Sequence, residues 1–72
     1  MRVLIDDPTL LNDLCAHFRR AGFTADPVDE GMAEVDRPDA PTPQQAAAEI
    51  RVHLQLWRIL NPDRRAELVP SS

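Results

Sequence analysis

The chain has 72 residues and a single cysteine, Cys15, so no internal disulfide can hold the domain together. A chain this short buries only a small core, and natural domains of this size often gain stability from a metal, a disulfide or a second subunit. The lone cysteine favours a reducing compartment. The N-terminus has no basic region followed by an apolar run, and no apolar segment reaches membrane-spanning length. The sequence therefore predicts a cytoplasmic protein.

The charge of the chain limits the partners it is expected to have. The net charge is −4, and all eight basic residues are arginine. Nucleic acid is usually bound by a basic patch, which an acidic chain does not favour. The abundance of arginine, alanine and proline is typical of GC-rich bacterial genomes. The expected partner is a second copy or another protein, and neither nucleic acid nor a membrane is expected.

A strand and an amphipathic helix are predicted at the start of the chain. Residues 2–6 are rich in aliphatic side chains, which favours a short strand. Asp7 and Pro8 then favour the start of a helix, because the carboxylate caps free N–H groups and proline needs no partner there. Gly22 favours the end of this helix. Its apolar stripe consists of Leu10, Leu11, Leu14, Phe18 and Ala21.

Residues 23–28 and 32–36 predict a β-hairpin, with Gly31 in the short connection between them. Pro27 has no N–H group to donate to a neighbouring strand, so the first strand of the hairpin is expected at the edge of a sheet. A stiff connector over residues 37–41 follows, without a helical or strand pattern.

Residues 42–60 predict a second helix with clear signals at both ends. Thr42 and Gln45 fit a capping box, and Asn61 followed by proline ends the helix. The predicted domain covers residues 1–61.

Residues 62–72 are predicted to form a C-terminal tail that is only partly ordered. Within it, residues 66–69 could form a fourth strand, or the segment after Asn61 could form a short helix.

The order of elements is β-α-β-β-α, with a possible fourth strand or helix in the tail. A right-handed crossover and an antiparallel hairpin place the third strand between the second and the first, with both helices on one face. This α+β order resembles a ferredoxin-like, or truncated ferredoxin-like, two-layer sandwich. The chain is also similar to short uncharacterised proteins of GC-rich bacteria, and that resemblance implies no established activity.

The second helix carries apolar residues on two opposite faces. At about 100° per residue, one face is predicted to pack on the sheet, with Trp57 as its anchor. This face contains Ala46, Ala47, Ile50, Leu54, Trp57 and Leu60. The opposite face, called the second stripe below, contains Ala48, Val52, Leu56 and Ile59. A polar wedge of Arg51, Gln55 and Arg58 separates the two faces.

The second stripe needs a cover, and the sequence leaves two possibilities. Leu68 and Val69 could fold back over it within one chain, or another protein surface could cover it. We expect a small homo-oligomeric or partner-binding module that uses the second stripe or the open edge of the first strand. The alternative is a regulatory domain that senses a small metabolite at a subunit interface.

The beginning of the chain resembles the start of a response-regulator receiver domain, with Asp6 and Asp7 after the first strand and a helix that ends near Gly22. The resemblance implies that the two carboxylates help to bind Mg²⁺. A receiver also needs a phosphoacceptor aspartate after its third strand, and Asp36 is the only candidate. Asp36 follows a tight hairpin, which does not fit a receiver. The preferred role of Asp7 is therefore a helix cap.

No catalytic, cofactor-binding or metal-binding residue is predicted. Cys15 and His17 lie about 200° apart around one helix, so they cannot bind one metal ion together, and His53 is on the other helix. Cys15 is expected to be a small core residue. Gly22 and Gly31 are the only glycines, which excludes a glycine-rich phosphate loop. We do not expect the protein to be an enzyme.

Overall fold

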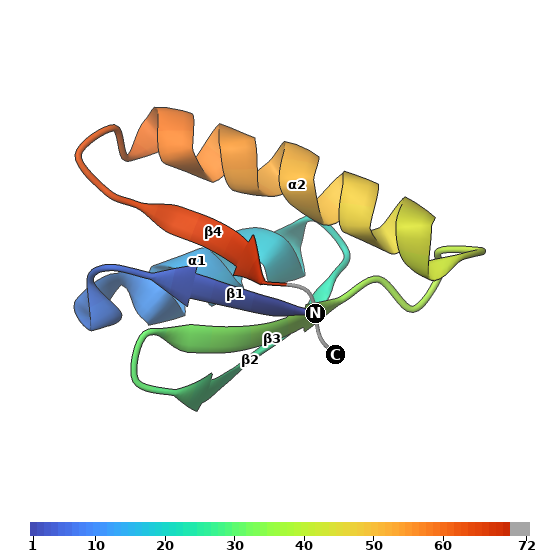
Figure 1. The fold of residues 1–72 in the computed structure, drawn as a ribbon, viewed down its shortest axis with the longest axis horizontal. Helices are drawn as coiled ribbons and strands as arrows, with labels where there is room; N and C mark the ends of the chain where they lie inside the picture. Colours follow the sequence, from blue (N-terminus) through green and yellow to red (C-terminus); the bar gives the residue numbers. More distant parts are fainter. Residues whose placement is uncertain (70–72) are drawn as a thin grey trace.

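The computed structural model describes residues 1–69, which form one antiparallel sheet and two helices (Figure 1). The elements in chain order are β1 (Arg2–Ile5), α1 (Leu11–Arg20), β2 (Thr24–Asp29), β3 (Met32–Asp36), α2 (Pro43–Leu60) and β4 (Ala66–Val69). A short 3₁₀ turn, η1 (Pro8–Leu10), precedes α1. The strand order is β2-β3-β1-β4, and each neighbouring pair is antiparallel.

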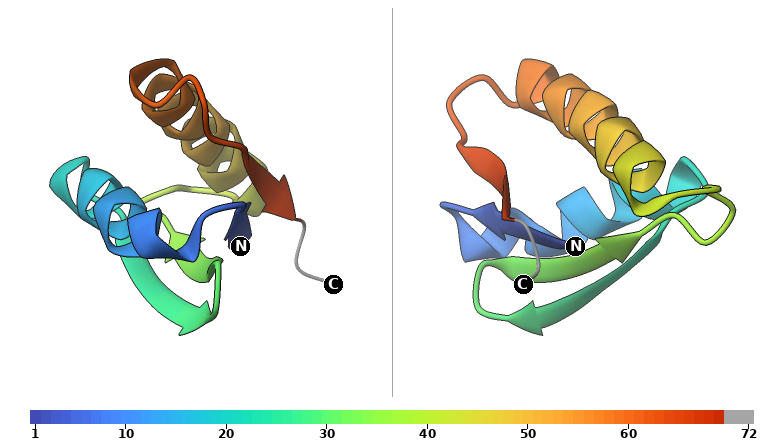
Figure 2. Two further views of the ribbon diagram at one scale, coloured as in Figure 1. Left: turned by 90° about the vertical axis from the view of Figure 1, so that its left-hand side faces the viewer. Right: turned by 45° about the vertical axis from the view of Figure 1, so that its right-hand side comes forward.

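The predicted fold class is confirmed. β3 lies between β2 and β1, and both helices cover the same face of the sheet, which gives two layers (Figure 2). The order of elements and strands is that of a small ferredoxin-like α+β fold. Of the two possibilities for the tail, the fourth strand is the one that forms.

The prediction that the first strand has an open edge is wrong, because β4 pairs with that edge. All four residues of β1 pair with β4, from Arg2 opposite Val69 to Ile5 opposite Ala66. The prediction that Leu68 and Val69 could fold back over the second stripe is also wrong, since both residues pair with β1 in the sheet. The second stripe is therefore left uncovered by residues 1–69.

Two side chains cap the helical segments as predicted. The Thr9 backbone N–H donates to Oδ1 of Asp7 at 3.0 Å, which caps the η1 turn ahead of α1. The Gln45 backbone N–H donates to Oγ1 of Thr42 at 3.1 Å at the start of α2. These bonds satisfy N–H groups that have no partner within the helix.

Gly31 joins the β2–β3 hairpin to β1. Its φ of +70° lies in the left-handed region, and a Cβ atom there would be 2.9 Å from the Ile5 carbonyl oxygen. The Ile5 backbone N–H donates to the Gly31 carbonyl at 2.8 Å. On the other side of the hairpin, β2 is an edge strand that contains Pro27 and an irregular register between Pro27 and Asp29, as the proline predicts.

The rotation of α2 about its axis is fixed by Trp57. This side chain is 1% exposed, and its Nε1–H donates to Oδ2 of Asp13 on α1 at 3.2 Å. The other buried residues of α2 are those predicted for the sheet-facing side, namely Ala46, Ala47, Ile50 and Leu54.

The prediction for Leu60 is wrong, since this side chain is 72% exposed. Leu60 is the last residue of α2. At 100° per residue it lies about 60° around the helix from Trp57, at the margin of the buried face.

Trp57→Ala should unfold much of the protein at room temperature. Truncation of a large buried aromatic residue costs about 3–5 kcal/mol, which is comparable to the whole stability of a domain of this size. Arg58→Ala, one residue away on an exposed position, should change the urea midpoint little. If both variants unfold with the wild-type midpoint, or if Arg58→Ala is the less stable, the assignment of the faces of α2 is wrong.

Candidate functional site

The second stripe forms an exposed apolar surface on the face of α2 that points away from the sheet. Val52 is 58% exposed, Leu56 46% and Ile59 65%, and Ala48 is exposed as well. Leu60 adjoins this surface at the end of the helix. Large apolar side chains that gather on one exposed face often mark an interaction site.

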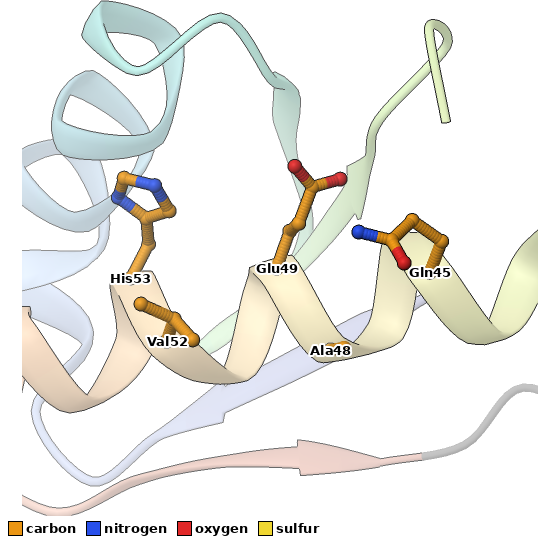
Figure 3. A pocket seen from close by; sticks show the side chains of 5 residues that line it. All are labelled: Gln45, Ala48, Glu49, Val52 and His53. Atoms are coloured by element: carbon orange, nitrogen blue, oxygen red, sulfur yellow. The ribbon is translucent and has the colours of Figure 1, made fainter. Parts of the chain in front are cut away.

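A shallow open depression of about 320 Å³ adjoins the second stripe. It is lined by Gln45, Ala48, Glu49, Val52 and His53, all from α2 (Figure 3). Glu49 and His53 project from the helix toward the end of α1 and the start of β2. Ala48 and Val52 belong to the second stripe too, so a protein that covers the stripe would also narrow this depression.

His53 joins α2 to the rest of the domain through an aromatic cluster. Its ring centre lies 5.9 Å from that of His17 on α1 and 5.1 Å from that of Phe23. The Arg37 guanidinium carbon lies 4.8 Å from the centre of the Phe23 ring. Nε of Arg37 lies 3.8 Å from Oε2 of Glu49. Nε2 of His17 is buried without a hydrogen-bond partner among residues 1–69.

Burial lowers the pKa of His53 below the ordinary histidine value. Positive charge at His17 and Arg37 acts in the same direction, whereas Glu49 opposes it. The folded protein therefore disfavours the protonated form of this side chain.

The carboxylates that resemble a receiver site lie apart. Asp7 follows β1, whereas Asp36 ends the antiparallel strand β3, at the opposite end of the sheet. Asp7 caps the η1 turn through hydrogen bonds that its carboxylate accepts from the hydroxyl and backbone N–H of Thr9. These bonds lower the pKa of Asp7, and the positive charge of Arg64 acts in the same direction. The structure therefore gives Asp7 the role of a cap.

Cys15 is a core residue, 1% exposed and packed in the main apolar cluster. Burial raises the pKa of its thiol, which disfavours the reactive thiolate. Among residues 1–69, no group of three or more His, Cys, Asp or Glu side chains could hold a metal ion.

Two features were missed by the sequence interpretation. The contact between His17 and His53 joins two helices, and no pattern in one sequence predicts such a pairing. Arg51 and Arg58 were assigned to a polar wedge, but they line a groove between α2 and β4. Their spacing of seven residues, which places them on one side of a helix, was the available signal.

Comparison of the chain with family models, curated proteins and solved structures finds no match. In the part of the chain that the structure describes, neither helix has the length and apolar content needed to cross a bilayer.

Acidification from about pH 7.5 to about pH 5.5 should destabilise the domain, because His53 has a lowered pKa in the folded state. The unfolded chain then takes up a proton near pH 6.5 that the folded chain resists, so the stabilisation present above that pH is lost as the pH falls. Urea unfolding across this range measures the effect.

His53→Gln should show a weaker dependence of stability on pH in the same range, since most carboxyl groups titrate at lower pH. An unchanged dependence in this variant would rule out His53 as its source.

Proposed function

We propose that the protein is a homodimeric interaction module in which the second stripes of two copies pack against each other. The observation that carries this proposal is the exposure of Val52, Leu56 and Ile59 on a helix whose opposite face is buried from Ala46 to Trp57. The described tail lies in the sheet, so it leaves the stripe to another surface. A second copy is the simplest occupant, because a two-fold contact covers both stripes at once.

The expected affinity is modest. Full burial of a large aliphatic side chain contributes about 1.5–3 kcal/mol, and the side chains of the stripe are already partly covered. About 1–2 kcal/mol remains for each, so a two-fold contact that also includes Leu60 gains about 8–16 kcal/mol. Association costs an estimated 4–15 kcal/mol. These terms are comparable, and we expect a reversible dimer whose population depends on concentration.

We place this dimer in a bacterial cytoplasm. The single, buried Cys15 supports a reducing compartment, and the composition supports a GC-rich source. A domain this small often needs more stability than its own core supplies, and its single cysteine allows no internal disulfide. This also supports a role for a second subunit in stability.

Leu56→Asp should abolish the dimer while the domain stays folded, because Leu56 is half exposed in the single chain and a carboxylate would be desolvated in the interface. Sedimentation equilibrium from about 10 μM to about 1 mM spans the expected range of dissociation constants. The wild type should shift from monomer toward dimer over this series, and the variant should remain monomeric.

Gln55→Asp is the matched control, since it places the same residue one position away on the exposed polar wedge. It should dimerise as the wild type does. A wild type that stays monomeric throughout the series would contradict the proposal, as would a folded Leu56→Asp variant that dimerises normally.

A second candidate, a metabolite sensor, is favoured by the depression beside the second stripe. A dimer formed through the second stripe would narrow this open depression. The depression offers Gln45, Glu49 and His53 as polar groups. Such a site at a subunit interface would suit a small polar metabolite.

A thermal-shift screen with metabolites and divalent metal ions separates the two candidates. An interaction module should keep its melting temperature, because only a compound that binds the folded state raises it. A sensor should be stabilised by one compound, and Leu56→Asp should lose this effect.

A further inference from the structure

β4 forms one edge of the sheet, and no strand among residues 1–69 pairs with its outer side. The other edge strand, β2, is blunted by Pro27 and by its irregular register, devices that discourage strand addition. β4 (Ala66–Val69) contains neither a proline nor a bulge.

The register shows which groups of β4 point outward. The Asp6 backbone N–H donates to the Arg65 carbonyl at 3.0 Å, and hydrogen-bonded pairs alternate along an antiparallel ladder. Arg65, Glu67 and Val69 therefore direct their backbone groups toward β1. Ala66 and Leu68 direct theirs to the free edge.

A groove of about 290 Å³ runs along this edge, between α2 and β4. We call it the α2–β4 groove. Buried Leu54 and Ala66 line it together with the partly buried Leu68. α2 runs along β4 in the opposite direction (Figure 1). Residues 51–58 of the helix form one wall of the groove.

Arg51 and Arg58 make this groove positively charged. Both are exposed, and neither forms an ion pair with residues 1–69, although the chain as a whole is acidic. Glu67 also borders the groove. Alternation along β4 directs its side chain to the opposite face of the sheet from Ala66 and Leu68. The side-chain charge on the wall formed by α2 is therefore positive.

We propose that the α2–β4 groove binds an extended, acidic segment of another protein, which adds to the sheet as a fifth strand beside β4. The backbone groups of Ala66 and Leu68 would pair with the added strand, as in other cases of strand addition. Its carboxylates would pair with Arg51 and Arg58, whose Cα atoms are about 10 Å apart along the helix. Side chains two residues apart on one face of a strand lie about 7 Å apart, so two carboxylates can reach both arginines.

A second copy of the chain is disfavoured as the occupant. Two-fold pairing of β4 with another β4 would set the two α2 helices side by side on the same face, with the same flanks toward each other. Arg51 and Arg58 of both copies would then face one another, and like charges would repel. An acidic partner has the complementary charge.

Fluorescence anisotropy with a labelled peptide of about six residues, the usual strand length, tests the proposal. A peptide of alternating glutamate and valine should bind. One of alternating lysine and valine should not, because it has the wrong charge. One of alternating glutamate and proline should not either, because proline lacks N–H groups. Binding of either control as tightly as the first peptide, or no binding of the first, would overturn the proposal.

Arg51→Glu and Arg58→Glu should each weaken binding about ten-fold or more, the usual effect of losing a charged hydrogen bond. Arg20→Glu, at an exposed position on α1 without an ion pair to residues 1–69, is the matched control and should bind normally. Equal affinity of all three variants would overturn the role of the groove.

Two further measurements separate strand addition from the proposed dimer. The backbone amides of Ala66 and Leu68 should exchange more slowly with solvent when the first peptide is bound, and unchanged exchange would overturn strand addition. Leu56→Asp should bind the peptide as the wild type does, because the second stripe faces away from the groove. The proposed dimer and the proposed strand addition can therefore each fail while the other holds.

Discussion

The burial of Trp57 determines how α2 lies on the sheet. A helix could present any side to the sheet, but the indole fills the core and its N–H donates to Asp13 on α1. This combination of apolar burial and one polar contact is typical of buried tryptophan. With Trp57 fixed, every other side chain of α2 has its direction decided by helical geometry.

Three surfaces of the molecule follow from this one rotation. The second stripe points away from the sheet, the flank with Glu49 and His53 faces α1 and β2, and the flank with Arg51 and Arg58 lies along β4. A rotation of about 100°, one residue step, would bring the arginine flank into the core. The directions of the apolar, aromatic and basic surfaces are therefore all set by the packing of Trp57, although these surfaces lie on different sides of the helix.

The fold was largely predictable because its signals are local. Asp7, Thr42, Gly31 and Pro27 each mark a cap, a turn or an edge through their own chemistry, and the structure places each in that role. The buried face of α2 follows from a period that repeats over the whole helix.

The rest depended on tertiary contacts. Residues 66–69 are too few for a pattern to distinguish strand from helix, so the sequence left β4 open and the α2–β4 groove could not be foreseen. Leu60 was misplaced because helical periodicity gives an angle but not the point at which the packing ends. The sequence predicted that α2 carries more apolar residues than its buried face needs. The location of β4 was needed to show that Leu68 and Val69 leave the second stripe uncovered.

The pairing of β1 with β4 joins the beginning and the end of the described chain, and this has a consequence for misassembly. The β2–β3 hairpin needs only a short loop, whereas β4 can dock on β1 only after nearly the whole chain has been brought together, and closing longer loops costs more entropy. Until that happens, the aliphatic strand Arg2–Ile5 presents an unpaired edge. Damage to β4 would prolong this state, and aggregation by edge-to-edge pairing of β1 strands is the failure that such a chain is most exposed to.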